Sequence, residues 1–477
     1  MADLDAVIIG SGPNGLAAAV ALAQSGYSVL VLEGHEAIGG GTRSAELTLP
    51  GFVHDVCSAV HPMGAISPYF RTLPLEQHGL RWIYPPASVA HPLDDGSAVL
   101  LRRSFSDTAS QFGTNAAKYQ RMIEPFLRAP EALLADALAP LGIPRHPLQM
   151  LRFGWRGMYS ADSFVKRFDD VRMRALFAGC ACHSILPFDR MPSAAIGLMF
   201  LVVGHLVDWP VAAGGSQMIA NSLASLLTSL GGRIETNRSI RSLNDLPEAR
   251  VWLFDTSPRQ LAEIAAPVLP SGYIRRLQKF RYGPGVFKLD WALSRSIPWR
   301  DPNCLSASTV HVGGTYEEIA ASESDAWNGQ HSERPVVLVS QQSEFDSARA
   351  PSGKHTGWAY CHVPAGSTLD QTEVIERQIE RFAPGFRDCI IARHSTSSLD
   401  FERYNPNYVG GAIAGGAADL YQLFTRPVAR LNPYTTPNPR VFICSASTPP
   451  GGGVHGMCGY HAAQAAIRTL RRQRVKV

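Results

Sequence analysis

The stretch that most constrains the fold runs from residue 6 to residue 33, AVIIGSGPNGLAAAVALAQSGYSVLVLE. The apolar run Ala6–Ile9 is typical of a buried parallel strand, and it leads directly into Gly-Ser-Gly-Pro-Asn-Gly at residues 10–15. An Ala- and Leu-rich segment then predicts a helix to Gln24, and Tyr27–Leu32 predicts a second strand. The sequence therefore predicts a βαβ unit with a glycine-rich first turn.

Each glycine of this turn has a separate physical task. Gly10 permits a tight turn, Gly12 lets the backbone approach a pyrophosphate, and Gly15 allows the helix to pack closely on the strand. The N-terminus of the helix directs free N–H groups and the positive end of its dipole at the phosphates. Glu33 follows Gly15 by 18 residues (33 − 15), close to the spacing of the acid that holds a ribose hydroxyl. This combination predicts a dinucleotide site.

Length and composition restrict the remaining possibilities. A chain of 477 residues is expected to form two or three domains. The net charge of +4 predicts no nucleic-acid partner. The eight cysteines form no CxxC pair, which favours reduced thiols, a cytoplasmic location and no paired redox cysteines. The longest apolar run, Ala194–Val207, is short for a membrane span, and the acidic N-terminus predicts no targeting segment.

Two further passages, at opposite ends of the chain, carry a family resemblance. Gly34–Arg43 (GHEAIGGGTR) follows the second strand, and the strand Arg440–Ser445 is followed by ASTPPGGGVHG and a predicted helix from Gly459 to Arg472. Together with the first turn, these passages resemble flavoproteins of the phytoene desaturase-like group, within the superfamily that includes amine oxidases. The chain departs from the pattern at Gly41, where many members carry Arg, and at Ala446, where many carry Gly.

The resemblance implies that FAD is the cofactor and that the loop after the last strand holds the flavin at its N1–C2=O edge. It also implies that Val60, His61 and Pro62 border the flavin ring, and that the strand predicted over 233–240 contacts the adenine. The cofactor-binding residues predicted in this way are Gly10, Ser11, Gly12, Pro13, Asn14, Gly15, Glu33, Gly39, Gly40, Gly41, Thr42, Arg43, Val60, Ile240, Ala446, Gly453, Val454 and His455.

Two histidines are candidate catalytic residues. His61 would titrate near neutral pH and act as acid or base, or it would only bond to backbone. His455 stands at the start of the last helix, where it would take part in catalysis or only cap the helix. No metal is expected, because Cys180-Ala-Cys182-His183 matches no structural zinc spacing.

The predicted fold class is α/β: a doubly wound, Rossmann-like FAD-binding domain with an inserted mixed α+β substrate domain. The FAD-binding domain would comprise residues 1–75, 205–270 and 405–477, and the substrate domain residues 76–204 and 271–404. Tyr282–Leu293, Pro335–Gln342 and Trp358–Pro364 are expected to form strands of one sheet in the substrate domain.

The predicted function is FAD-dependent hydride transfer between flavin N5 and a small lipophilic substrate, such as an isoprenoid or polyene. Two alternatives stay open: an amine-oxidase-like flavoenzyme, and a non-catalytic FAD-binding interaction protein. The electron acceptor, the direction of transfer and the oligomeric state are not predicted. The basic end, Arg468 to Lys476, is expected to be a solvated tail, with peripheral membrane contact as the alternative.

Overall fold

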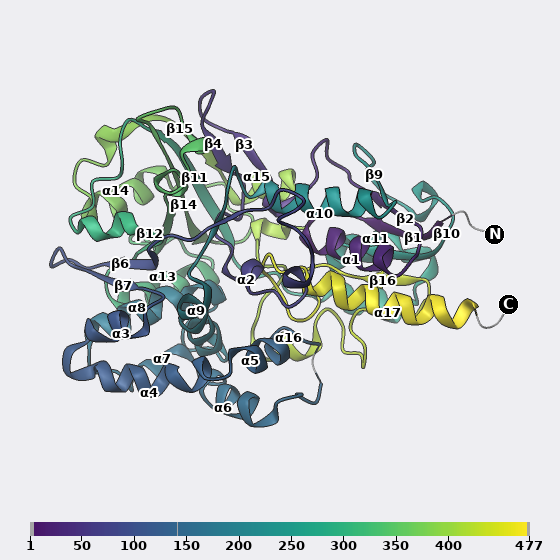
Figure 1. The fold of residues 1–477 in the computed structure, drawn as a ribbon, viewed down its shortest axis with the longest axis horizontal. Coiled ribbons are helices and arrows are strands. Elements are labelled where there is room, and N and C mark those ends of the chain that lie inside the picture. Colours follow the sequence, from purple (N-terminus) through teal and green to yellow (C-terminus); the bar gives the residue numbers. More distant parts are fainter. Residues whose placement is uncertain (1–3, 141, 475–477) are drawn as a thin grey trace.

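A computed structural model describes residues 4–140 and 142–474, without the side chain of Arg474, so Lys476 of the basic end lies outside the described residues. Its first sheet is parallel, with the strand order β16-β10-β1-β2-β9 (Figure 1). The strands are β1 (Leu4–Ile9), β2 (Val29–Leu32), β9 (Arg233–Glu235), β10 (Ala249–Phe254) and β16 (Val441–Ile443).

Helices cover both faces of this sheet, because alternate residues of its apolar strands point to opposite sides. Ala6 and Ile8 of β1 pack in one cluster with α1 (Pro13–Gln24), α10 (Gln217–Ser229) and α17 (Met457–Arg474). Val7 and Ile9 pack in another cluster with α11 (Pro258–Ile264) and α12 (Ser271–Gln278). The predicted doubly wound, Rossmann-like fold class is confirmed.

The second sheet is mixed and has seven strands in the order β15-β11-β14-β13-β12-β6-β7. It contains β11, β13 and β14, so the prediction that these three segments share one sheet is confirmed. The strands are β6 (Ala87–Pro92), β7 (Ala98–Leu101), β11 (Gly285–Leu293), β12 (Ala307–Val312), β13 (Val337–Ser340), β14 (His355–Val363) and β15 (Ile390–Thr396). Two strand pairs complete the set: β3 (Ser44–Glu46) with β4 (Val53–Asp55), and β5 (Trp82–Ile83) with β8 (Val211–Ala212).

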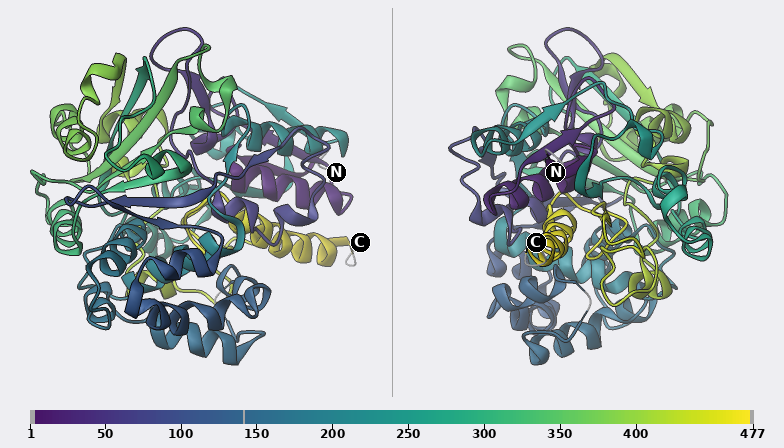
Figure 2. Two further views of the ribbon diagram at one scale, coloured as in Figure 1. Left: turned by 60° about the vertical axis from the view of Figure 1, so that its left-hand side comes forward. Right: turned by 90° about the vertical axis from the view of Figure 1, so that its right-hand side faces the viewer.

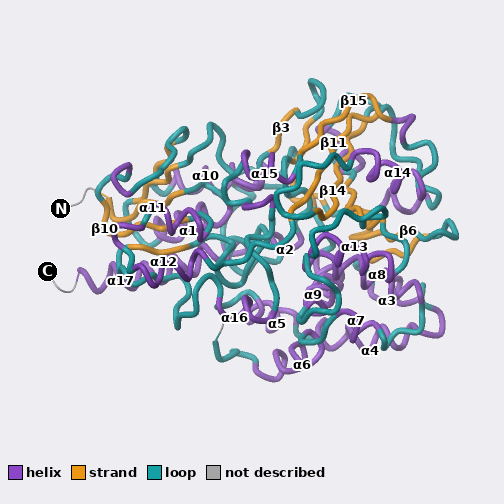
Figure 3. Tube along the Cα trace, turned by 180° about the vertical axis from the view of Figure 1, so that it is seen from behind, coloured by secondary structure: helices purple, strands orange, loops and turns teal. Residues whose placement is uncertain are grey.

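A helical layer packs beside the second sheet and is grouped together in the tube view (Figure 3). Its central helix is α9 (Ser193–Val207), which is buried along most of its length as its apolar sequence predicts. The other helices of this layer are α3 (Phe105–Ser110), α4 (Ala116–Leu127), α5 (Pro130–Ala137), α6 (Pro147–Gly157), α7 (Ala161–Val165) and α8 (Val171–Ala181). Within the described residues, no helix has the length and apolar character needed to cross a bilayer.

The remaining described α-helices are α2 (Pro62–Ala65), α13 (Tyr316–Trp327), α14 (Thr372–Phe382), α15 (Ser398–Tyr404) and α16 (Leu420–Thr425). One local prediction is wrong: the strand predicted over 233–240 ends at Glu235, and Asn237 adopts a left-handed φ of 55°.

Candidate functional site

The glycine-rich turn after β1 has the geometry that its sequence predicts. Gly10 has a φ of 102°, and its N–H donates to the carbonyl of Leu32 at 2.8 Å. A Cβ on Gly15 would lie 2.2 Å from the carbonyl oxygen of Gly10, so no other residue permits this close packing of α1 on the strand. The structural reasons predicted for Gly10 and Gly15 are confirmed.

Asp255 lies opposite this turn, immediately after β10. Its Oδ2 accepts the N–H of Gly15 at 2.8 Å and would lie 2.8 Å from a Cβ placed on Gly12. Burial raises the pKa of Asp255 to about 7, the N–H of Gly15 lowers it, and the charge of Glu33 raises it further. A Cβ at Gly12 would therefore meet the carboxyl group of Asp255, which is a structural reason for glycine at this position.

Glu33 is held at the end of β2 by several donors. Its Oε2 accepts the N–H of Ser11 at 2.9 Å, and its Oε1 accepts the N–H of His35 at 2.9 Å. The guanidinium of Arg43 pairs with the same Oε1 at 3.1 Å. The backbone N–H of Arg238 donates to the carbonyl of Glu33 at 2.7 Å, so the segment leading to half-buried Ile240 runs alongside the acid. Their proposed contacts with ribose and adenine stay predictions.

The glycine loop after β2 folds back over the first turn. Gly39 and Gly40 have φ values of 114° and 53°, and a Cβ on Gly40 would lie 3.2 Å from the Cα of Gly12. A Cβ on Gly41 would lie 2.2 Å from the hydroxyl of Tyr408. The loop thus forms a narrow backbone cradle beside Gly12 that side chains would fill. Arg43 fixes its far end by donating from Nε to the carbonyl of Ala37 at 2.8 Å.

The C-terminal glycine loop lies next to this cradle, although more than 400 residues separate the two in sequence. A Cβ on Gly459 would lie 1.8 Å from the carbonyl oxygen of Asn14, and a Cβ on Gly456 would lie 2.9 Å from the Cβ of Ala17. The first turns of α1 and α17 are therefore in direct contact, and the two helices run side by side (Figures 1 and 2). The structure brings the two sequence motifs together.

Arg426 supports the C-terminal loop from behind and was not identified from the sequence. Its guanidinium donates to the carbonyls of Ala446 at 2.8 Å, Ser447 at 3.2 Å and Gly415 at 3.1 Å. Arg426 is buried, and burial lowers its pKa to about 10. Its hydrogen bonds fix the backbone of the loop that begins at Ala446.

Both candidate catalytic histidines are buried and neutral at pH 7. His61 Nε2 lies 2.8 Å from the hydroxyl of Ser216, and burial lowers the pKa of His61 to about 4. The expectation that His61 titrates near neutral pH is wrong. His455 Nδ1 accepts the N–H of Met457 at 3.0 Å at the start of α17, and burial lowers its pKa to about 4. A catalytic role for either stays a prediction.

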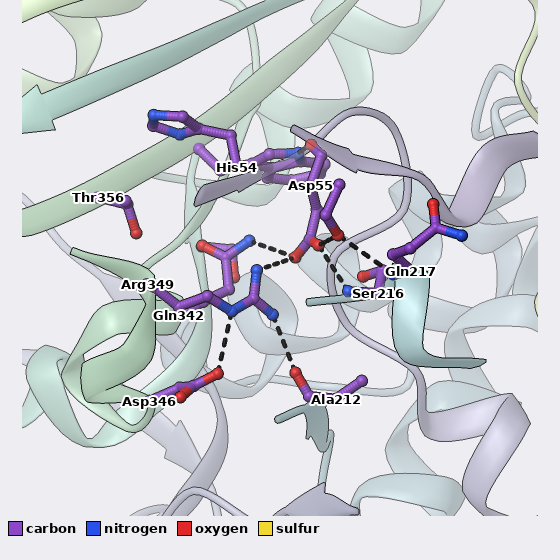
Figure 4. Close-up of polar contacts among 12 residues, drawn as sticks. His54, Asp55, Ala212, Ser216, Gln217, Gln342, Asp346, Arg349 and Thr356 are labelled. Atoms are coloured by element: carbon purple, nitrogen blue, oxygen red, sulfur yellow. Dashed lines mark hydrogen bonds and ion pairs between the residues drawn. The ribbon is translucent and has the colours of Figure 1, made fainter. Parts of the chain in front are cut away.

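A buried ion cluster fixes Ser216 (Figure 4), whose hydroxyl in turn contacts the ring of His61. Ser216 donates its N–H to Asp55 Oδ1 at 2.7 Å, and Asp55 Oδ2 pairs with Arg349 at 3.0 Å. Arg349 also pairs with Asp346 at 3.0 Å. Arg349 lowers the pKa of Asp55 against the effect of burial, so the carboxyl stays ionised. The cluster joins β4 to the loops that precede α10 and β14.

Further along the same region, β11 places a buried lysine among aromatic and acidic groups. Lys288 pairs with Asp290, and its Nζ lies 5.6 Å from the ring centre of Trp358. Burial raises the pKa of Asp290 to about 6, and burial lowers that of neighbouring His54 to about 3. The sequence predicted this strand but did not identify Lys288 and Asp290 as site residues. The two residues are separated by two positions, which places them on the same face of the sheet.

Val60, predicted to border the flavin ring, packs against the large apolar cluster that contains α9. Cys180 and Cys182 are buried, and His183 Nε2 lies 3.0 Å from His311 Nε2. Burial lowers the pKa of His183 to about 3. Among the described residues, no group of three or more His, Cys, Asp and Glu side chains could hold a metal ion.

Residues 8–73 match the NAD(P)-binding Rossmann-like domain. The chain is 25% identical to pyridine nucleotide-disulfide oxidoreductase domain-containing protein 2 of Rattus norvegicus, covering 98% of this chain and 94% of that protein. It is 26% identical to the chloroplastic prolycopene isomerase of Daucus carota, over 84% of this chain and 70% of that protein. It is 22% identical to the lycopene-forming phytoene desaturase of Pseudescherichia vulneris, over 97% of this chain and 98% of that protein.

Solved structures share the fold at low sequence identity. An oxidoreductase from Methanosarcina mazei matches with a TM-score of 0.65 and 14% identity over 98% of this chain and 100% of that one. A putrescine oxidase variant matches with a TM-score of 0.62 and 18% identity over 99% of each chain. All eight cysteines of the chain are buried, and none is paired in a disulfide.

These relatives confirm the predicted resemblance to phytoene desaturase-like oxidoreductases. The chain is an oxidoreductase with a Rossmann-like domain of the kind that binds a dinucleotide cofactor.

Proposed function

We propose that the protein binds FAD and transfers hydride between the flavin and a small lipophilic substrate. The observation that carries the proposal is the direct contact between the first turns of α1 and α17. This contact places the pyrophosphate-type turn at residues 10–15 beside the glycine loop at residues 451–456. The diphosphate of FAD lies between its adenosine and its flavin, so a turn that binds the diphosphate and a loop that holds the flavin would have to lie close together.

The residues present fit that cofactor. The narrow backbone cradle formed by Gly12, Gly39 and Gly40 leaves room for phosphate oxygens that a side chain would exclude. The carboxylate of Glu33 already accepts from several donors and can accept from a ribose hydroxyl at the same strand end. Bound flavin would supply the hydride chemistry at N5. The start of α17 and the amides of residues 451–453 would stabilise negative charge at N1 and O2.

An apolar substrate is supported by the side chains on the other side of this site. Val60 and Met63 pack against the apolar cluster containing α9, and the neutral ring of His61 adds no charge there. Two relatives are named for prolycopene and phytoene, which are hydrocarbon polyenes. An apolar surrounding excludes water and keeps proton exchange away from the flavin.

The test is anaerobic titration of purified, flavin-loaded protein, followed by visible absorbance. We expect the flavin bands to bleach with an apolar polyene and to persist with alkylamines and diamines. Bleaching with amines alone would instead establish the amine-oxidase-like alternative. Flavin that persists with both substrates, yet cannot donate hydride to a polyene after chemical reduction, would favour the non-catalytic binding protein. Absence of flavin after reconstitution would refute the proposal.

A further inference from the structure

Large apolar side chains are exposed along one stripe of α6. The exposed fraction is 72% for Leu148, 66% for Leu151 and 70% for Trp155. These residues follow spacings of three and four and therefore share one face of the helix. The opposite face, with Gln149 and Phe153, is buried against the helical layer. α6 thus directs one apolar face inward and a second one outward.

Further exposed apolar side chains lie on and beside α16. The carbonyl of Tyr159, just after α6, accepts the N–H of Ala194 at 3.3 Å, and the carbonyl of Met191 accepts the N–H of Leu420 at 3.1 Å. The start of α9 is therefore bonded to the segment after α6, and Met191 just before α9 is bonded to the start of α16; α6, α5 and α16 all lie in the lower part of the molecule in Figure 1. Met191, Tyr421 and Phe424 are exposed by 46%, 74% and 56%.

A surface hollow of about 580 Å³ lies within this region and is lined by Arg190, Met191, Arg281, Asp419, Leu420 and Tyr421. We call the exposed surface of residues 142–158, Met191 and residues 420–431 the α6–α16 face. Most of the large apolar side chains that are exposed on the described surface belong to this face, and such a concentration marks an interaction site.

The residues that form the α6–α16 face carry only positive charges, and three acidic residues, Asp136, Asp189 and Asp419, border it. Residues 142–158 and 420–431 contain no Asp or Glu, whereas Arg145, Arg152 and Arg430 are exposed. Asp419 beside the hollow is paired with Arg281 at 2.6 Å, so its charge is compensated there. Helices that lie in the interface of an anionic membrane typically carry Leu and Trp on one face and Arg at the borders of that face, as α6 does.

We propose that the α6–α16 face docks the protein on the surface of an anionic lipid bilayer, with α6 lying parallel to that surface. The indole of Trp155 and the side chains of Leu148 and Leu151 insert at the level of the headgroups. The guanidinium groups of Arg145 and Arg152 bind lipid phosphates. Docking does not depend on the proposed function, but delivery of a bilayer-dissolved substrate through this face does.

The experiment is flotation of flavin-loaded protein with vesicles of phosphatidylcholine containing phosphatidylglycerol, compared with phosphatidylcholine alone. We expect binding to the anionic vesicles that weakens as salt rises, because exposed charges are screened. The triple variant Leu148→Ser, Leu151→Ser, Trp155→Ser should bind at least about tenfold more weakly, since it removes most of the inserted apolar area. The variant Leu369→Ser, Ile391→Ser alters comparably exposed residues outside the face and should bind as the parent does.

A second measurement locates the contact. Brominated lipids should quench tryptophan emission of the parent protein, and Trp155→Phe should remove most of that quenching while flotation persists. Equal flotation of the parent and triple variant, or no flotation of the parent, would overturn the proposal. A parent that self-associates while the triple variant is monomeric, without vesicle binding by either, would assign the face to protein contact and also overturn it. Flavin bleaching by soluble substrate should be unchanged in the triple variant, so a failure of membrane docking can be distinguished from a failure of the proposed function.

Discussion

Replacing Asp255 with Asn should stabilise the dinucleotide-free protein at neutral pH and leave its stability nearly unchanged near pH 4. An asparagine side chain at this position is isosteric and retains an oxygen that can accept the N–H of Gly15, which Asp255 accepts at 2.8 Å. The amide cannot ionise. The substitution therefore removes the charge of this buried group while it preserves the hydrogen bond.

The magnitude follows from the pKa of Asp255. Burial raises that pKa from 3.8 to about 7 in the folded protein. Below the lower of these values Asp255 is protonated in both the folded and the unfolded protein, so its ionisation does not change the free energy of unfolding. Between the two values the folded protein binds more protons than the unfolded protein, so the free energy of unfolding falls as pH rises. Each pKa unit corresponds to about 1.36 kcal/mol, which gives a loss of about 4 kcal/mol above the folded-state pKa.

The assay is urea denaturation of the dinucleotide-free protein across the range from about pH 4 to about pH 8, which spans both pKa values. We expect the stability difference between Asp255→Asn and the parent to increase across this range. Asp189→Asn, which alters an exposed carboxyl, should give no such increase. A difference between Asp255→Asn and the parent that does not change with pH would refute the electrostatic reasoning.

Three other substitutions test the site. Gly12→Val should abolish flavin retention, measured as flavin absorbance per protein, whereas Gly154→Ala, where a Cβ meets no atom within 4 Å, should retain it. Arg349→Met should destabilise the protein by about 3–5 kcal/mol in urea denaturation, because it leaves Asp55 buried without its cation, and adding Asp55→Asn should recover part of the loss. His455→Ala should lower stability by about 1 kcal/mol through loss of a helix-start acceptor, and an unchanged flavin reduction rate would contradict a catalytic role.

The βαβ unit that begins the chain could be predicted because its determinants are local. The apolar run of β1, the glycines of the turn and the helix to Gln24 follow one another directly in the chain, and each has one conformational solution. The end of β9 was predicted wrongly, because Asn237 leaves the strand by a left-handed turn that its sequence tolerates but does not require. Local sequence specifies the turn at Gly10 but not the length of an edge strand.

The second sheet shows the limit of local patterns. β6 pairs in parallel with β12, and Ala87 lies opposite Ala307, 220 residues later in the chain (307 − 87). Nothing in the sequence of β6 indicates that partner. The same holds for the pKa of His61, which is lowered by burial and by the charge of Arg349 and raised by the charge of Asp55. A histidine in a loop is expected to be exposed, and only the packing of distant elements buries it.

The candidate site therefore divides into two kinds of residue. Glycines at the loops are visible in the sequence, because a left-handed φ or a close backbone approach excludes other residues. The roles of the charged residues Arg426 and Asp255 have no comparable sequence signal, because any distant residue that reaches the loops could supply the charge. Arg426 binds three carbonyls at the loop that begins at Ala446, and Asp255 faces the first turn of α1. Buried charges are costly unless they are compensated. Their concentration where the two glycine loops meet is thus an independent argument, besides the motifs, that this junction is the functional part of the molecule.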